Sequence, residues 1–135
     1  MIEVYSNNVT VPAGSTFPLS NVKVIKGCTA TLNGNGIQLN KAGVYSISVS
    51  LTAEPATAGD VSIALYKNGV SDAGSGTQFT GAVETISAAS FPALVQCPQN
   101  NDPCCCCTAP TTVSIVNTSD VDITGDITVV VTKLC

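Results

Sequence analysis

The sequence contains no histidine, no arginine and no tryptophan, and charged residues make up only 10% of its 135 positions. Histidine is the commonest general base in catalysis and a frequent zinc ligand, so histidine-dependent triads and histidine-ligated zinc sites are excluded. Without arginine, the chain also lacks the side chain that clamps carboxylates and phosphates with two parallel hydrogen bonds. These absences predict a protein that is not an enzyme.

Positive charge is scarce and dispersed along the chain. Nine Asp and Glu residues outnumber five lysines, giving a net charge of −4. The lysines are Lys23, Lys26, Lys41, Lys67 and Lys133. Nucleic-acid binding needs clustered basic side chains, so we expect no nucleic-acid partner.

Long hydrophobic segments are missing as well. No apolar run approaches the ~20 residues that a helix needs to cross a bilayer, so we expect no membrane association. Residues 1–5 carry neither the basic region nor the hydrophobic stretch of a secretion signal. The simplest interpretation is a small protein made in the cytoplasm.

Valine, isoleucine and threonine are abundant, and together they account for 42 residues. Their branched side chains are stiff and fit the pleated, half-buried surface of a sheet. Eleven glycines and seven prolines supply frequent turns between the apolar runs. The composition therefore predicts an all-β sandwich or barrel, a single domain over residues 1–135. Roughly eight to ten short antiparallel strands with frequent turns fit a jelly roll or a related sandwich.

The clearest predicted strand covers residues 45–51, where large apolar residues alternate strictly with serine. A period of two places alternate side chains on opposite faces of a sheet. Residues 61–65 repeat the pattern, and Asn68-Gly69 is a strong signal for a hairpin turn. The side chains expected in the core are Tyr45, Ile47, Val49, Leu51, Val61, Ile63, Leu65, Val113, Ile115, Ile127 and Val129.

Other segments are predicted from weaker signals. Residues 2–5 and 9–11 are expected to form two short strands separated by a turn at Asn7-Asn8. Residues 74–81 are expected to form a loop of small residues, and 85–96 a longer strand in which Pro92 indicates an edge or a bulge. Residues 121–134 are expected to hold the last one or two strands.

Seven cysteines are the most unusual feature of the sequence. They are Cys28, Cys97, Cys104, Cys105, Cys106, Cys107 and Cys135. A cysteine-rich loop is expected at about 97–110, and without a nearby histidine or arginine nothing obvious activates its thiols. Adjacent cysteines rarely bond each other, so disulfides would reach outward within the chain or to a neighbouring subunit. Disulfide cross-links are the favoured interpretation, and reduced thiols are an alternative.

Metal binding is a further alternative for two groups of residues, although no cofactor is the leading expectation. Cys104 and Cys107 have the separation of a zinc-ligand pair, with Cys97 as a third candidate, but no second such pair exists. For calcium the candidates are Asp120, Asp122 and Asp126, which lack the spacing of a calcium loop.

A face of small hydroxyl side chains is predicted opposite the core face of the strand at 45–51. It comprises Ser46, Ser48, Ser50 and Thr52, and it either meets solvent or forms a close, hydrogen-bonded subunit contact. The other candidates for interface anchors, each of which could equally lie in the core, are Tyr5, Tyr66, Phe79 and Phe91.

Residues 37–49 resemble the Gly-x-Tyr-x-apolar strand of the tumour-necrosis-factor and complement-q-type jelly rolls, with Gly43, Tyr45 and Ile47 at the matching positions. Residues 61–70 are similar to the next strand and hairpin of that superfamily, and 127–134 to its closing strand. The resemblance implies a ten-stranded jelly roll that assembles as a trimer around a three-fold axis. Its bacterial and phage members include small decoration or fibre proteins of virions and the tips of collagen-like spore-surface glycoproteins.

The function implied by this resemblance is structural. A short, Ser/Thr/Asn-rich jelly roll without a collagen-like stalk is most like a phage protein of Gram-positive gut bacteria. We expect a homotrimeric capsid decoration or head-fibre protein that contacts itself and a major capsid or other virion protein. It would lie on the virion surface after assembly in the bacterial host cytoplasm. The alternative is a glycan- or ligand-binding jelly-roll module on a spore or cell surface, because jelly rolls also serve as lectins.

Overall fold

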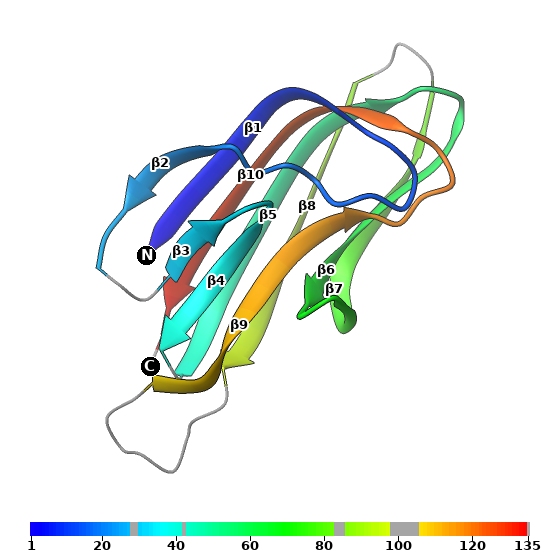
Figure 1. Ribbon diagram of the computed structural model, residues 1–135. Helices are drawn as coiled ribbons and strands as arrows, with labels where there is room; N and C mark the ends of the chain where they lie inside the picture. Colours follow the sequence, from blue (N-terminus) through cyan, green and yellow to red (C-terminus); the bar gives the residue numbers. More distant parts are fainter. Residues whose placement is uncertain (28–29, 42, 83–85, 98–105, 135) are drawn as a thin grey trace.

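The computed structural model describes residues 1–27, 30–41, 43–82, 86–97 and 106–134. Ten strands are described, and they form a two-layered sandwich (Figure 1). The strands are β1 (Ile2–Val11), β2 (Asn21–Ile25), β3 (Ala30–Asn33), β4 (Gly36–Lys41), β5 (Gly43–Pro55), β6 (Gly59–Lys67), β7 (Val70–Gly81), β8 (Ser87–Cys97), β9 (Cys106–Asn117) and β10 (Ile123–Lys133). None of the described residues belongs to a helix with the length and hydrophobicity needed to cross a membrane. The all-β jelly-roll prediction is confirmed.

Each layer is a five-stranded antiparallel sheet. The first sheet has the strand order β2-β1-β10-β5-β8, and the second has the order β3-β4-β9-β6-β7. Consecutive strands such as β4 and β5 therefore lie in different sheets, which is the interleaved connectivity of a jelly roll. Both β8 and β7 are edge strands, so the expectation that Pro92 marks an edge is confirmed.

The core fills the space between the two sheets, and the predicted alternation sets its register. Every side chain expected to point inward is buried, while Ser48, Ser50 and Thr52 on the other face of β5 are exposed. Strand β5 pairs along its whole length with β10 on one side and β8 on the other. Large side chains that the alternation did not identify, including Phe17, Leu19 and Phe91, complete this core.

Turn chemistry explains one hairpin and one irregularity. Asn68 and Gly69 both have positive φ angles, of 53° and 81°, as a two-residue turn between β6 and β7 requires. Asn8 also has a positive φ, of 51°, and here the chain forms a bulge inside β1 instead of ending a strand. The prediction of two separate strands at residues 2–5 and 9–11 is therefore wrong.

The expected loop at residues 74–81 is the second error. These residues belong to β7, whose register pairs Phe79 with Val61 and Gly76 with Ala64 of β6. A Cβ atom at position 76 would lie 2.8 Å from the carbonyl oxygen of Ile63, so the small residue permits the close approach of the two strands. Segments rich in glycine and serine have low intrinsic strand propensity, and here pairing with β6 overrides it.

Tyr45 is among the largest fully buried side chains of the core, and its hydroxyl donates a hydrogen bond to the carbonyl oxygen of Lys41 at 2.7 Å. Burial disfavours the charged phenolate and raises the pKa of Tyr45. The folded state therefore holds this proton more tightly than the unfolded chain does.

The stability of the protein is expected to depend on Tyr45 at alkaline pH. Its contribution is fully present below the unfolded pKa of about 10, and it is lost as pH rises through the higher folded value. Tyr45→Phe removes this titration and, at neutral pH, about 0.5–1.5 kcal/mol of hydrogen bonding. Urea denaturation at increasing pH checks this prediction. The difference in free energy of unfolding between the wild type and Tyr45→Phe should shrink as the pH rises. A gap that is constant with pH would contradict it.

Candidate functional site: the outer face of the first sheet

The outward side chains of β5, β8 and β10 form one continuous surface, which we call the hydroxyl face. The register aligns them in rows across the sheet, because Ser48 pairs with Pro92 of β8 and with Val130 of β10. The remaining rows are Leu94-Ser46-Thr132, Ser90-Ser50-Thr128 and Ala88-Thr52-Asp126. Serine and threonine at the centre of this face confirm the predicted orientation of β5.

The middle of the hydroxyl face carries no charge. Between Ser46 and Thr52 of β5, and from Ser87 to Gln96 of β8, every outward side chain is neutral. At the far side of the sheet, Glu3 of β1 is paired with Lys23 of β2 at 3.6 Å. Exposed apolar side chains accompany the hydroxyls, and Leu94 is 67% exposed. The Glu54 and Asp126 carboxylates lie at one end of the face, so a second surface can approach its middle rows closely without desolvating an unpaired charge.

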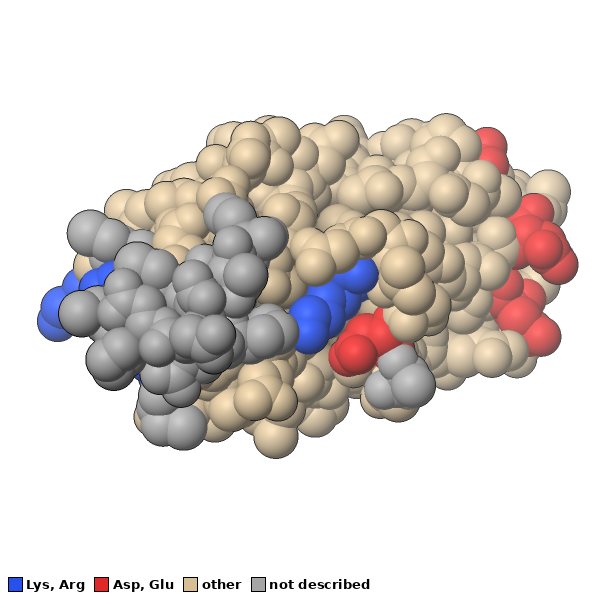
Figure 2. All heavy atoms as spheres, turned by 60° about the horizontal axis from the view of Figure 1, so that its bottom comes forward, with Lys and Arg blue, Asp and Glu red and all other residues tan. Residues whose placement is uncertain are grey.

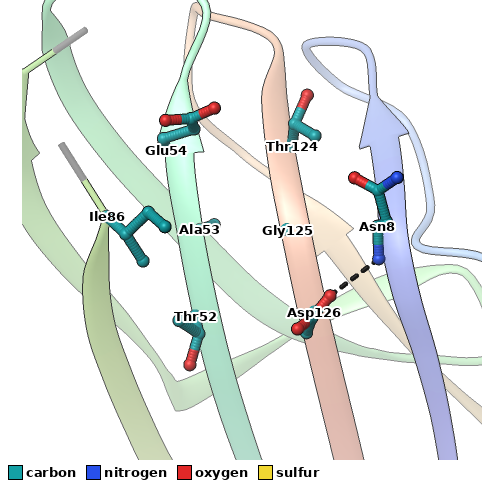
Figure 3. Close-up of a pocket in the computed structure, with 8 residues that line it drawn as sticks. All are labelled: Asn8, Thr52, Ala53, Glu54, Ile86, Thr124, Gly125 and Asp126. Carbon is teal, nitrogen blue, oxygen red and sulfur yellow. Dashed lines mark hydrogen bonds between the residues drawn. The ribbon is translucent and has the colours of Figure 1, made fainter. Parts of the chain in front are cut away.

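A hollow of about 290 Å³ interrupts the face where β5 ends and β10 begins (Figure 3). Its floor is Gly125, at which a Cβ atom would lie 2.1 Å from the carbonyl oxygen of Thr52, so no other residue fits there. The Asp126 carboxylate accepts a hydrogen bond from the backbone N–H of Asn8 at 2.7 Å and fixes the bulge of β1. Glu54 and Ile86 line the opposite side. The hydrogen bond between Asn8 and Asp126 thus ties β1 to β10 at the edge of this hollow.

The three aspartates considered for calcium do not form a site. Asp122 accepts a hydrogen bond from the N–H of Ala13 at 3.0 Å, and Asp126 accepts one from Asn8. Across the described residues, no group of three His, Cys, Asp or Glu side chains is arranged to hold a metal ion. Asp126 instead ties the bulge of β1 to β10, and Asp122 ties the turn after β1 to the residues that lead into β10.

Acidic side chains gather at one end of the sandwich, as the red atoms in Figure 2 show. This is the end where β5 finishes and β6 and β10 start, since Glu54 is paired with Thr124, and Asp60 lies opposite Thr80. Lys41 and Lys133 lie at the ends of β4 and β10 toward the other end. The long axis of the molecule therefore has an acidic end and an end with more lysines.

The aromatic candidates divide between surface and core. Tyr5 is half-buried on the outer face of the first sheet, in the same row as Thr128. Phe91 is buried and Phe79 packs against the core, so neither is available as an exposed anchor. Tyr66 is half-buried on the outer face of the second sheet. Pro92 and Leu94 also belong to the hydroxyl face and were not predicted there, although the alternation of Phe91, Ala93 and Val95 indicates their outward position.

The cysteine-rich segment falls largely outside the described residues. Its backbone is described at Cys97, which ends β8, and at Cys106, which begins β9. The cysteines outside the description are Cys28, Cys104, Cys105 and Cys135. The predicted zinc ligands Cys97, Cys104 and Cys107 and the predicted cross-links therefore remain predictions.

No protein-family model matches the sequence, and no curated protein matches it either. Solved structures do resemble the fold. The globular domain of zebrafish complement 1qA protein is 10% identical, with a TM-score of 0.66 over 96% of this chain and 94% of that one. Eiger TNF from S. frugiperda is 14% identical, with a TM-score of 0.65 over 99% and 92% of the two chains. The PRD1 vertex protein P5 is 16% identical, with a TM-score of 0.55 over 95% and 93%.

These similarities extend over nearly the whole of each chain. The protein therefore has the jelly-roll fold of the tumour-necrosis-factor and complement-q type, and it shares that fold with a phage vertex protein. The resemblance noted in the sequence at Gly43, Tyr45 and Ile47 is confirmed at the level of the fold.

Proposed function

We propose that this chain is a non-enzymatic structural protein that assembles as a homotrimer and decorates the surface of a phage capsid, as a head-decoration or head-fibre protein. The observation that carries the proposal is the neutral middle of the hydroxyl face on the first sheet of a jelly roll of this type. The trimeric assembly and the virion location have separate support and separate tests.

Self-association is supported by the chemistry of the hydroxyl face. Small side chains such as Ser48 and Ser50 allow close approach, and each hydroxyl can donate as well as accept a hydrogen bond. Leu94 and Pro92, both exposed, add apolar area beside them. A surface that combines neutral hydrogen-bonding groups with apolar contacts can be buried at low desolvation cost.

The two edges of the first sheet favour cyclic closure over a symmetric pair. Strand β2 forms one edge and exposes Val22 and Ile25, and β8 forms the other and exposes Leu94. Contacts between unlike surfaces generate closed rings when the rotation between subunits closes. Trimers are the general assembly of the family that the sequence resembles, so three subunits are the expected number.

Ser48→Arg is expected to convert the trimer into monomers. The substitution places a long charged side chain in the middle of the hydroxyl face, where burial without a partner costs about 3 kcal/mol, or roughly a hundredfold in affinity per contact. Light scattering should give three times 13.7 kDa for the wild type and 13.7 kDa for the variant. Gln78→Arg is the matched control, because Gln78 is exposed on the outer face of the second sheet. A monomeric wild type, or a trimeric Ser48→Arg, would contradict the proposal.

The virion location is supported by the likeness to the PRD1 vertex protein P5. The proposed partner besides the chain itself is a major capsid or other virion protein. Purified particles should contain the chain, and a high-resolution map should show three-fold jelly-roll density on the capsid. Absence from particles, together with recovery from spore or cell-surface fractions, would favour a surface module instead.

A further inference from the structure

A second cavity lies on the opposite side of the molecule from the hydroxyl face. It has a volume of about 470 Å³ and opens on the outer face of the second sheet, where β6 and β9 run side by side (Figure 1). Tyr66 of β6 and Ser114 of β9 are directly paired, and both project outward. Thr16 completes the wall from the connection after β1, where it is paired with Val116. The cavity thus joins three segments that are distant in the sequence.

The chemistry of the cavity is polar but neutral. Among the described residues that line it, none is charged. The hydroxyls of Tyr66, Thr16 and Ser114 make no hydrogen bond to any other described residue. Each of these groups is therefore free to donate and to accept. The Tyr66 ring adds an apolar surface of fixed shape beside the hydroxyls.

The hairpin that carries Tyr66 is held in place before any ligand arrives. Its turn residue Asn68 donates from its backbone N–H to the carbonyl oxygen of Thr112 at 2.8 Å. The side-chain oxygen of Asn68 accepts a hydrogen bond from the backbone N–H of Thr112 at 2.9 Å. Two hydrogen bonds therefore fix the turn against β9.

The opposite wall is fixed by a buried amide. Asn117 is fully buried, and its side-chain nitrogen donates to the carbonyl oxygens of Val11, Pro12 and Val121 at 3.0–3.3 Å. The backbone N–H of Gly14 in turn donates to the Asn117 carbonyl oxygen at 2.8 Å. A site whose walls are fixed in advance loses less conformational entropy when it binds a ligand.

We propose that this cavity binds a neutral saccharide. An aromatic ring can stack on the C–H face of a sugar, and the three free hydroxyls can pair with sugar hydroxyls, which also both donate and accept. The absence of charge in the lining disfavours phosphate, carboxylate and ammonium ligands. The hydroxyl groups of the lining disfavour purely apolar ligands, which would leave them without hydrogen bonds. The volume is within the ordinary range for small-ligand pockets.

The saccharide site is independent of the trimer and of the virion location. It lies on the second sheet, whereas the proposed subunit contact lies on the first. If the hydroxyl face is buried in a trimer, three such cavities face outward together. Individually weak sites would then gain avidity on a surface with several copies of a glycan.

The test uses the full chain, labelled with ¹⁵N, and the methyl glycosides of glucose, galactose, mannose and N-acetylglucosamine as probes. Titration to about 50 mM, above the ~1 mM scale of weak single sites, should shift the amide signals of Tyr66, Ser114 and Thr16 for at least one sugar. Tyr66→Ala should weaken that binding about tenfold or more, and Tyr66→Phe by a smaller factor. Thr16→Val, which keeps the shape of an exposed side chain, should weaken it several-fold without affecting the fold.

The control is Gln78→Ala, which alters the same outer face away from the cavity and should leave binding unchanged. The proposal is overturned if none of the four glycosides shifts the cavity amides, or if Tyr66→Ala and Thr16→Val bind as well as the wild type. Tighter binding of an anionic sugar such as N-acetylneuraminate would overturn the assignment to neutral ligands. A monomeric protein that still binds the sugar would contradict the proposed trimer and leave this site supported.

Discussion

Ile47→Ala is expected to lower the free energy of unfolding by about 2–5 kcal/mol, because it removes a fully buried side chain from an interior strand of the first sheet. Ile47 is paired with Val131 of β10 on one side and with Ala93 of β8 on the other, so packed strands surround the cavity left behind. Urea denaturation at one fixed protein concentration measures the change, since subunit association contributes to the apparent stability.

A matched pair of variants keeps this test specific. Ile63→Ala probes the second sheet at an equally buried position and should cost a similar amount. Gln78→Ala changes an exposed residue and should stay within about 0.5 kcal/mol of the wild type. A loss below about 1 kcal/mol for Ile47→Ala would mean that this side chain does not fill the core as described.

The core was readable from the sequence because local pattern and tertiary burial agree there. In β5 every odd residue from 45 to 51 is large and apolar and every even one is serine, so only one register buries the apolar set. Asn68-Gly69 specified its turn by the same local logic. By contrast, β7 could not be recognised, because Gly74, Ser75 and Gly76 have no strand propensity of their own and are held by β6.

The candidate sites were readable only in part. The serines of β5 were identified as a face, but the rows that they form with Val130 and Leu94 depend on which strands become neighbours. The saccharide cavity was invisible, because Thr16, Tyr66 and Ser114 meet only after β6 and β9 pair and the connection after β1 docks beside them. Long-range pairing of this kind leaves no periodic signal in the sequence.

Reducing the protein is expected to destabilise it strongly, because we propose that cysteines of the segment at 97–110 form disulfide bonds within the chain or between subunits. Cys97 ends β8 in one sheet and Cys106 begins β9 in the other, so a cross-link near these residues would join strands of different layers. A bond of this kind restricts the unfolded chain and contributes about 2–4 kcal/mol in the loop-entropy model. The odd total of seven cysteines leaves at least one thiol free or bonded to another subunit.

The measurement compares the melting temperature of the native assembly with reductant, with chelator and with neither. Reductant alone should lower it by roughly 10 °C for each bond lost, since 1 kcal/mol corresponds to a few degrees in a domain of this size. Cys97→Ser should reproduce part of this loss if Cys97 is bonded, and the variant should then respond less to reductant. If the chelator alone lowers the melting temperature, the stabilising element is a metal site at Cys97, Cys104 and Cys107 and not disulfide bonds. If neither agent changes the melting temperature and all seven thiols titrate after denaturation, the cysteines are unlinked and the proposal fails.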